Sequence, residues 1–148
     1  MKKQKFIFIT LILLGCSWIV AYFLTPTKTI YLHPEAIGYL YDQRTGLALA
    51  DQTGDLGYYI AADDRFKKTL SASGAFKLPA FEIQYKFFRP NMRKLGGPLQ
   101  IYIAFEGYEG KIFDYSEVYW QQVPDEKNSP YIFNQINVGK IYLTPEKS

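Results

Sequence analysis

Few residues of this chain have the chemistry for catalysis or metal binding. The sequence holds one histidine, His33, and one cysteine, Cys16. This excludes an internal disulfide, a Cys–His nucleophile pair and most metal sites, which need several such ligands. We therefore expect His33 to be a surface or packed residue and the protein to need no metal.

The acidic residues give only a weak indication of a site. They cluster at residues 51–55 (DQTGD) and at Asp63 and Asp64. A calcium site needs six or more oxygen ligands, and no D-x-D-x-D-G pattern is present. Polar turns at strand ends are favoured instead. A hydrolase using Asp63, Asp64 or His33 remains a third hypothesis, and the sequence singles out no catalytic residue and no cofactor.

The loop from Phe87 to Gly97 (FFRPNMRKLGG) is the strongest candidate for binding. It carries three cations, two aromatic rings and a methionine between two strong strand patterns. Arginine, methionine and aromatic residues are enriched at protein interfaces, and loops on β-sandwiches commonly carry binding. Contact with anionic lipid headgroups and a simple solvated hairpin are the alternatives. The candidate partner-binding residues here are Phe88, Arg89, Met92, Arg93 and Lys94.

A second candidate lies at residues 115–122 (YSEVYWQQ). Alternation along a strand would place Tyr115 and Tyr119 on one face and Trp120 on the other. Tryptophan is usually buried, so the tyrosine face is expected to be exposed. Tyr115 and Tyr119 are therefore further candidates for binding a protein partner or a glycan.

The elements that must position these residues are strands. Residues 81–87 and 99–105 alternate apolar with mostly polar residues, and Ile141 and Leu143 oppose Lys140 and Tyr142. Residues 37–41, 58–61, 75–78 and 113–120 are also rich in β-forming residues. No long window after the first 24 residues shows helical periodicity. Turn sequences such as Arg44-Thr45-Gly46 and Ser73-Gly74 separate the runs. The pattern predicts an all-β fold, an antiparallel sandwich of about seven strands over residues 30–148.

A basic start and an apolar run precede this domain. Residues 1–5 hold three lysines, residues 6–24 hold no charge, and residues 25–29 form a short polar linker. The run is about the ~20 residues that span a bilayer, and the lysines favour a cytoplasmic start. We expect an uncleaved transmembrane or signal-anchor helix, with the domain outside the cytoplasm in a bacterial periplasm or at the cell surface. The alternative is a lipoprotein signal lipidated at Cys16 within Leu13-Leu14-Gly15-Cys16.

Composition agrees with one folded domain and argues against nucleic acid as a partner. The chain has 148 residues, 18% of them aromatic, which is too aromatic for a disordered protein. The net charge of +3 comes from the first five residues, and the remainder is balanced. A basic nucleic-acid-binding domain is therefore disfavoured.

Four stretches resemble the carboxypeptidase-regulatory-like family. Residues 37–50 are similar to its opening strand and Asp–x–x–Thr–Gly turn, and residues 73–78 to its Gly–x–Phe–x–Leu hairpin. Residues 105–109 match its x–Gly–Tyr turn, and residues 137–143 its closing Leu–Gly–x–Ile–x–Leu strand. Ala48 and Ser73 depart from the usual Pro and Asp. The resemblance implies a transthyretin-like, Ig-like sandwich that is generally non-catalytic.

The leading hypothesis is a non-catalytic, membrane-anchored envelope protein whose sandwich binds a protein partner or stabilises an assembly. A glycan- or peptidoglycan-binding module is the first alternative, because twelve tyrosines follow the apolar run. A protective, immunity-type protein also fits the expected location.

Overall fold

A computed structural model describes residues 2–59, 66–91, 95, 97–123 and 133–147. The helices are α1 (Lys2–Leu24) and α3 (Ser116–Gln122). The first strands are β1 (Lys28–His33), β2 (Glu35–Asp42), β3 (Thr53–Tyr58), β4 (Phe66–Thr69) and β5 (Ala75–Leu78). The remaining strands are β6 (Phe81–Tyr85), β7 (Gln100–Phe105), β8 (Lys111–Asp114) and β9 (Gln135–Leu143). The chain is thus mostly β-sheet, as the sequence predicts.

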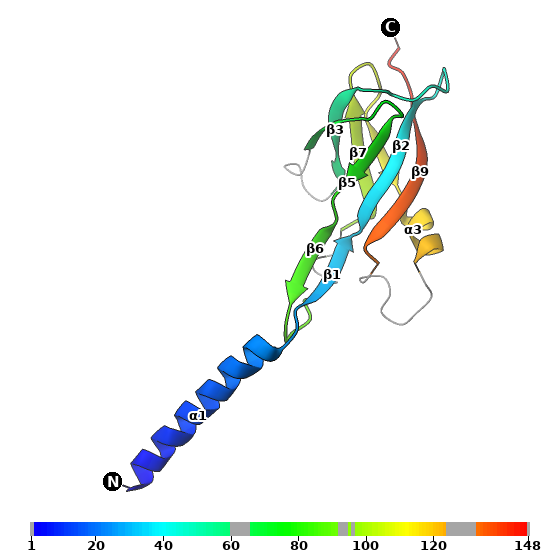
Figure 1. The fold of residues 1–148 in the computed structure, drawn as a ribbon. Helices are drawn as coiled ribbons and strands as arrows, with labels where there is room; N and C mark the ends of the chain where they lie inside the picture. The colour runs from blue at the N-terminus through cyan, green and yellow to red at the C-terminus, as the bar shows by residue number, and fades with distance from the viewer. Residues whose placement is uncertain (1, 60–65, 92–94, 96, 124–132, 148) are drawn as a thin grey trace.

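The molecule is elongated. Helix α1 leads into a two-stranded ribbon of β1 and β6, which we call the stalk, and the stalk leads into two larger sheets (Figure 1). One sheet has the order β5-β2-β9 and the other β4-β3-β7-β8. The N-terminus lies at the helix end and the C-terminus beside the far end of the sheets (Figure 1).

The two larger sheets pack into one core. Inward-facing residues of both sheets form a single buried cluster, with Leu40, Ile136 and Leu143 from one sheet and Leu56 and Ile103 from the other among its members. Alternation places these residues inside because successive side chains of a strand point to opposite faces. The predicted opposition of Ile141 and Leu143 to Lys140 and Tyr142 is confirmed, with Ile141 and Leu143 on the inner face.

The stalk continues the β2–β5 ladder beyond two prolines. Ala36 pairs with Leu78 in the sandwich and His33 with Phe81 in the stalk. Pro34 and Pro79 stand between these pairs. Proline has no N–H to donate to a ladder, so one proline in each strand separates stalk from sandwich at the same level.

The strand run at residues 81–87, the clearest in the sequence, lies in the stalk and not in the sandwich. Its apolar face covers only a small cluster with Ile30 and Leu32, and Phe81 and Phe87 remain exposed. Phe87, the last apolar residue of this alternating run, therefore lies outside the core. A two-stranded ribbon has no second sheet to cover its apolar face.

Two further expectations were wrong. Strands β2 and β9 pair in parallel, so the sheet is not purely antiparallel. Residues 116–122 form helix α3 and not the continuation of a strand. Tyr119 of this helix and Tyr115, its N-cap residue, both point into the core because a spacing of four residues brings two side chains to one helical face.

Helix α1 ends at Leu24, and β1 begins at Lys28, inside the expected linker at 25–29. Among the residues that the structure describes, no helix combines the length and apolar character needed to cross a membrane. The transmembrane anchor expected over residues 6–24 is therefore not supported there. Cys16 lies exposed within α1, and its lipidation stays a prediction.

Candidate binding surface

His33, the lone histidine, is buried where the stalk meets the sandwich. Its Nδ1 lies 2.8 Å from the Tyr115 hydroxyl, and its ring stacks on Tyr58 with centroids 4.8 Å apart. Tyr58 donates a hydrogen bond to the Pro34 carbonyl and accepts one from the Ala36 N–H. The cluster holds the bend between β1 and β2 in place.

The side chains of this cluster are uncharged near pH 7, as is usual for buried titratable groups. Burial lowers the pKa of His33 to about 4, so the ring is neutral near pH 7. Burial also raises the pKa values of Tyr58 and Tyr115 above the ordinary tyrosine range. None of these groups is accessible to a substrate. Of the two alternatives left open by the sequence, a surface residue or a packed one, the structure shows the packed one.

The described residues bring together no metal site. In that part of the chain no group of three or more His, Cys, Asp or Glu side chains could hold a metal ion. Asp63 and Asp64 lie outside the described residues. The expected turn at Asp42 is present, since its carboxylate accepts hydrogen bonds from the N–H groups of Arg44 and Thr45.

The predicted binding loop starts at the base of the stalk, beside the end of α1. Phe88 is 88% exposed, and the neighbouring Phe87 ring lies 6.0 Å from the ring of Tyr22. Arg89 follows in the same described segment, whereas Met92, Arg93 and Lys94 lie outside the described residues. The segment that directly follows β6 therefore lies at the end of the stalk away from the sandwich (Figure 1), whereas Gly97, at the other end of the loop, lies close to His33.

The second predicted surface is not a surface. Tyr115 is 0% exposed and Tyr119 is also buried, whereas Trp120 is 59% exposed. The predicted faces are reversed because the segment is helical. Tyr115 and Tyr119 are thus core residues, and they are removed from the candidate binding set.

An exposed tyrosine surface exists elsewhere, on the outer face of β2 and β9. We call it the tyrosine face, and it consists of Ile37, Tyr39, Tyr41, Lys140 and Tyr142. Register places Tyr39 beside Lys140 and Tyr41 beside Tyr142 on one face of the sheet. Tyr39 is 41% exposed and Tyr142 is 43% exposed.

Contacts within the tyrosine face hold three of its side chains, Tyr41, Lys140 and Tyr142, in place. The rings of Tyr41 and Tyr142 lie 5.7 Å apart at an angle of 39°. The Lys140 ammonium lies 5.1 Å from the Tyr41 ring centroid, within the range of a cation–π contact. Preorganised rings lose little conformational entropy on binding, which favours their use in an interface.

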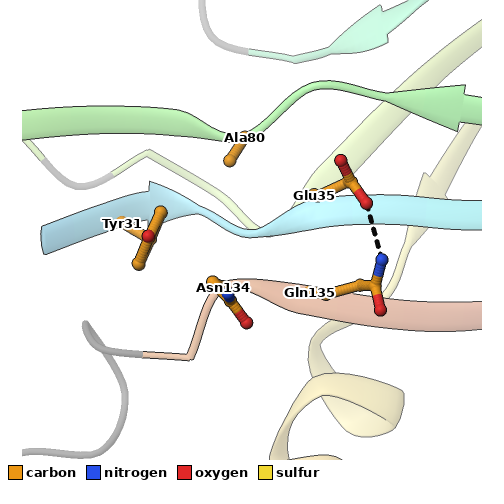
Figure 2. A pocket seen from close by; sticks show the side chains of 5 residues that line it. All are labelled: Tyr31, Glu35, Ala80, Asn134 and Gln135. Atoms are coloured by element: carbon orange, nitrogen blue, oxygen red, sulfur yellow. Dashed lines mark hydrogen bonds between the residues drawn. The ribbon is translucent and has the colours of Figure 1, made fainter.

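A polar recess lies where β1 leads into β2 (Figure 2), at the end of β2 that carries Glu35. Its volume is about 270 Å³, and its lining residues are Tyr31, Glu35, Ala80, Asn134 and Gln135. The Glu35 carboxylate accepts hydrogen bonds from Gln135 at 2.6 Å and from Lys77 at 2.7 Å. These contacts, Lys77 first, lower the pKa of Glu35. Because Lys77 neutralises the carboxylate, the recess suits neutral hydrogen-bonding groups such as amides.

The strand alternation in the sequence already indicates which residues form this face. In residues 37–42, Ile37, Tyr39 and Tyr41 alternate with Gly38, Leu40 and Asp42. The same alternation sets Lys140 and Tyr142 against buried Ile141 and Leu143. What the sequence does not show is that β2 and β9, far apart in the chain, are neighbours.

Comparison with known proteins assigns no family. No family model matches the chain, and no curated protein matches it. Among solved structures, it is similar to the backbone protein of group B streptococcus pilus 2b, with a TM-score of 0.30 and 10% identity. The match covers 78% of this chain and 42% of the pilus protein. At this TM-score the likeness assigns neither fold family nor function.

Proposed function

We propose that the protein is a non-catalytic binding protein whose sandwich uses the tyrosine face to bind a protein partner. The observation that carries this proposal is one sheet face on which the exposed Tyr39 and Tyr142 lie with Tyr41 and Lys140, the Tyr41 ring being in contact with both Tyr142 and Lys140. Tyrosine is enriched among the residues that dominate protein interfaces. The neutral recess at the Glu35 end of β2 offers amide and phenol groups for hydrogen bonds from a partner.

The proposal predicts a large loss of affinity when two exposed tyrosines are removed. Loss of one such anchor costs about 2 kcal/mol, so Tyr39→Ser and Tyr142→Ser should each weaken the complex about thirtyfold. Both side chains point away from the core, so the variants should keep the fold. The measurement is titration of the purified partner against the wild-type and variant chains.

Site-specific crosslinking identifies that partner. A photoreactive phenylalanine analogue at position 39 should give a covalent adduct of defined mass in the source cells. The matched control is the analogue at Ile112, an exposed residue on the other sheet. Adducts of the same mass and yield at both positions would show that the tyrosine face is not the interface.

Glycan binding is the second candidate, favoured by the same exposed ring pair, because tyrosine rings can pack against sugar rings. Insoluble cell wall incubated with the chain distinguishes the two candidates. Saturable co-sedimentation that is lost in the Tyr39→Ser, Tyr142→Ser double variant would establish the glycan. Co-sedimentation that is absent, or unchanged by the substitutions, would leave the protein partner as the occupant.

A further inference from the structure

The junction between α1 and the stalk has a composition and contacts unlike those of the sandwich. We call it the collar, and it consists of Tyr22, Phe23, Lys86, Phe87, Phe88 and Arg89. The Lys86 ammonium donates a hydrogen bond to the Tyr22 carbonyl at 3.0 Å and lies 4.1 Å from the Tyr22 ring centroid. These two contacts join the last turn of α1 to the residue that directly follows β6. A hollow of about 440 Å³ lies between the helix end and the end of β6.

Helix α1 carries exposed apolar side chains on every side of its described part. Exposed large apolar residues occur at Ile12, Leu13 and Leu14 and again at Trp18, Ile19 and Val20. Successive residues are turned by about 100°, so three in a row point in different directions around the helix. A protein partner covers one face of a helix, whereas an apolar medium covers all of them.

The collar itself combines rings with positive charge. Phe23 and Phe88 are largely exposed, and Tyr22 is half exposed. In the described residues 22–31 and 82–91 the charged side chains are Lys28, Lys86 and Arg89 against Glu82. Aromatic rings favour the boundary between acyl chains and headgroups, and lysine and arginine attract the phosphates of those headgroups.

We propose that the collar lies in the headgroup region of a phospholipid bilayer, with Phe87 and Phe88 at the acyl-chain boundary and Lys86 and Arg89 at the phosphates. The exposed apolar side chains at the C-terminal end of α1, which adjoin the collar, contact the acyl chains of the same leaflet. The stalk then holds the sandwich, and with it the tyrosine face, away from the lipid surface (Figure 1). This proposal is independent of what the tyrosine face binds.

The test places a single tryptophan in the collar. In a full chain carrying Trp18→Phe and Trp120→Phe, the substitution Phe88→Trp provides the only indole. The chain is reconstituted into vesicles of phosphatidylcholine and phosphatidylglycerol whose acyl chains are brominated, because bromine quenches a tryptophan that it contacts. The matched control is Leu47→Trp in the same background, at an exposed turn of the sandwich.

The proposal expects blue-shifted emission from position 88 and several-fold stronger quenching there than at position 47. Two results would overturn it. One is a chain that floats with the vesicles while position 88 is unquenched and emits as in water. The other is blue-shifted emission without quenching, which would show that a protein surface, such as a second copy, covers the collar.

Discussion

Replacing Gly74 by alanine is expected to lower the free energy of unfolding by about 3 kcal/mol. Gly74 adopts φ +72°, a backbone conformation that costs other residues energy. An added Cβ would also lie 2.6 Å from the Leu40 carbonyl oxygen, which belongs to backbone that cannot turn aside. The Gly74 carbonyl accepts the Leu40 N–H at 2.9 Å, so any shift disturbs the pairing of the turn with β2.

Gly46 provides the matched control because it separates the two causes. Its φ of +69° is nearly the same, yet a Cβ there would meet no atom within 4 Å. Gly46→Ala should therefore lower the free energy of unfolding by about 1 kcal/mol, the cost of placing alanine at a positive φ. Equilibrium urea unfolding in a mild detergent, followed by circular dichroism, measures both. Equal losses for the two variants would mean that the contact with Leu40 contributes nothing.

Acidification from pH 8 to pH 4 is expected to remove about 3 kcal/mol of stability through His33 alone. The pKa of His33 falls from 6.5 in the unfolded chain to about 4 in the folded one. The folded state therefore binds the proton less well than the unfolded state does. The full contribution is present above pH 6.5 and decreases as the pH falls from 6.5 towards 4.

The structural cause is the lack of a partner for the new charge. The ring faces Tyr58 and Tyr115, both uncharged at these pH values, and the buried Nε2 has no hydrogen-bond partner among the described residues. His33→Phe keeps a ring against Tyr58 and removes the titration. The free energy of unfolding, measured against pH for both chains, should diverge below pH 6.5, with the histidine chain losing more. Parallel curves would show that His33 does not cause this loss of stability. Carboxylates such as Glu35 are present in both chains, so their titration affects both curves equally.

Local patterns in the sequence predicted much of the sandwich core and its turns. Alternation placed Ile101, Ile103 and Phe105 inside, and all three are buried. The Asp42–Gly46 turn formed as expected because its signals are local: a side chain that caps N–H groups and a glycine with positive φ.

What the sequence could not show depends on contacts between distant residues. Phe81–Tyr85 alternates as cleanly as a core strand, but whether a second sheet covers it is decided elsewhere in the chain. Residues 116–122 are rich in β-forming side chains, and burial of Tyr119 in the core outweighs that preference. The tyrosine face was missed for a related reason, since it exists only because β2 and β9 are adjacent.

The parallel pairing of β2 with β9 has a consequence for the synthesis of the protein on the ribosome. Glu35 and Gln135 are paired although one hundred residues separate them in the chain. At synthesis rates of about 5–20 residues per second, β9 is synthesised roughly 5–20 seconds after β2. During that interval the β2 edge is open to pairing with other chains. Aggregation of nascent chains should therefore be concentrated in the seconds before residues 135–143 emerge from the ribosome.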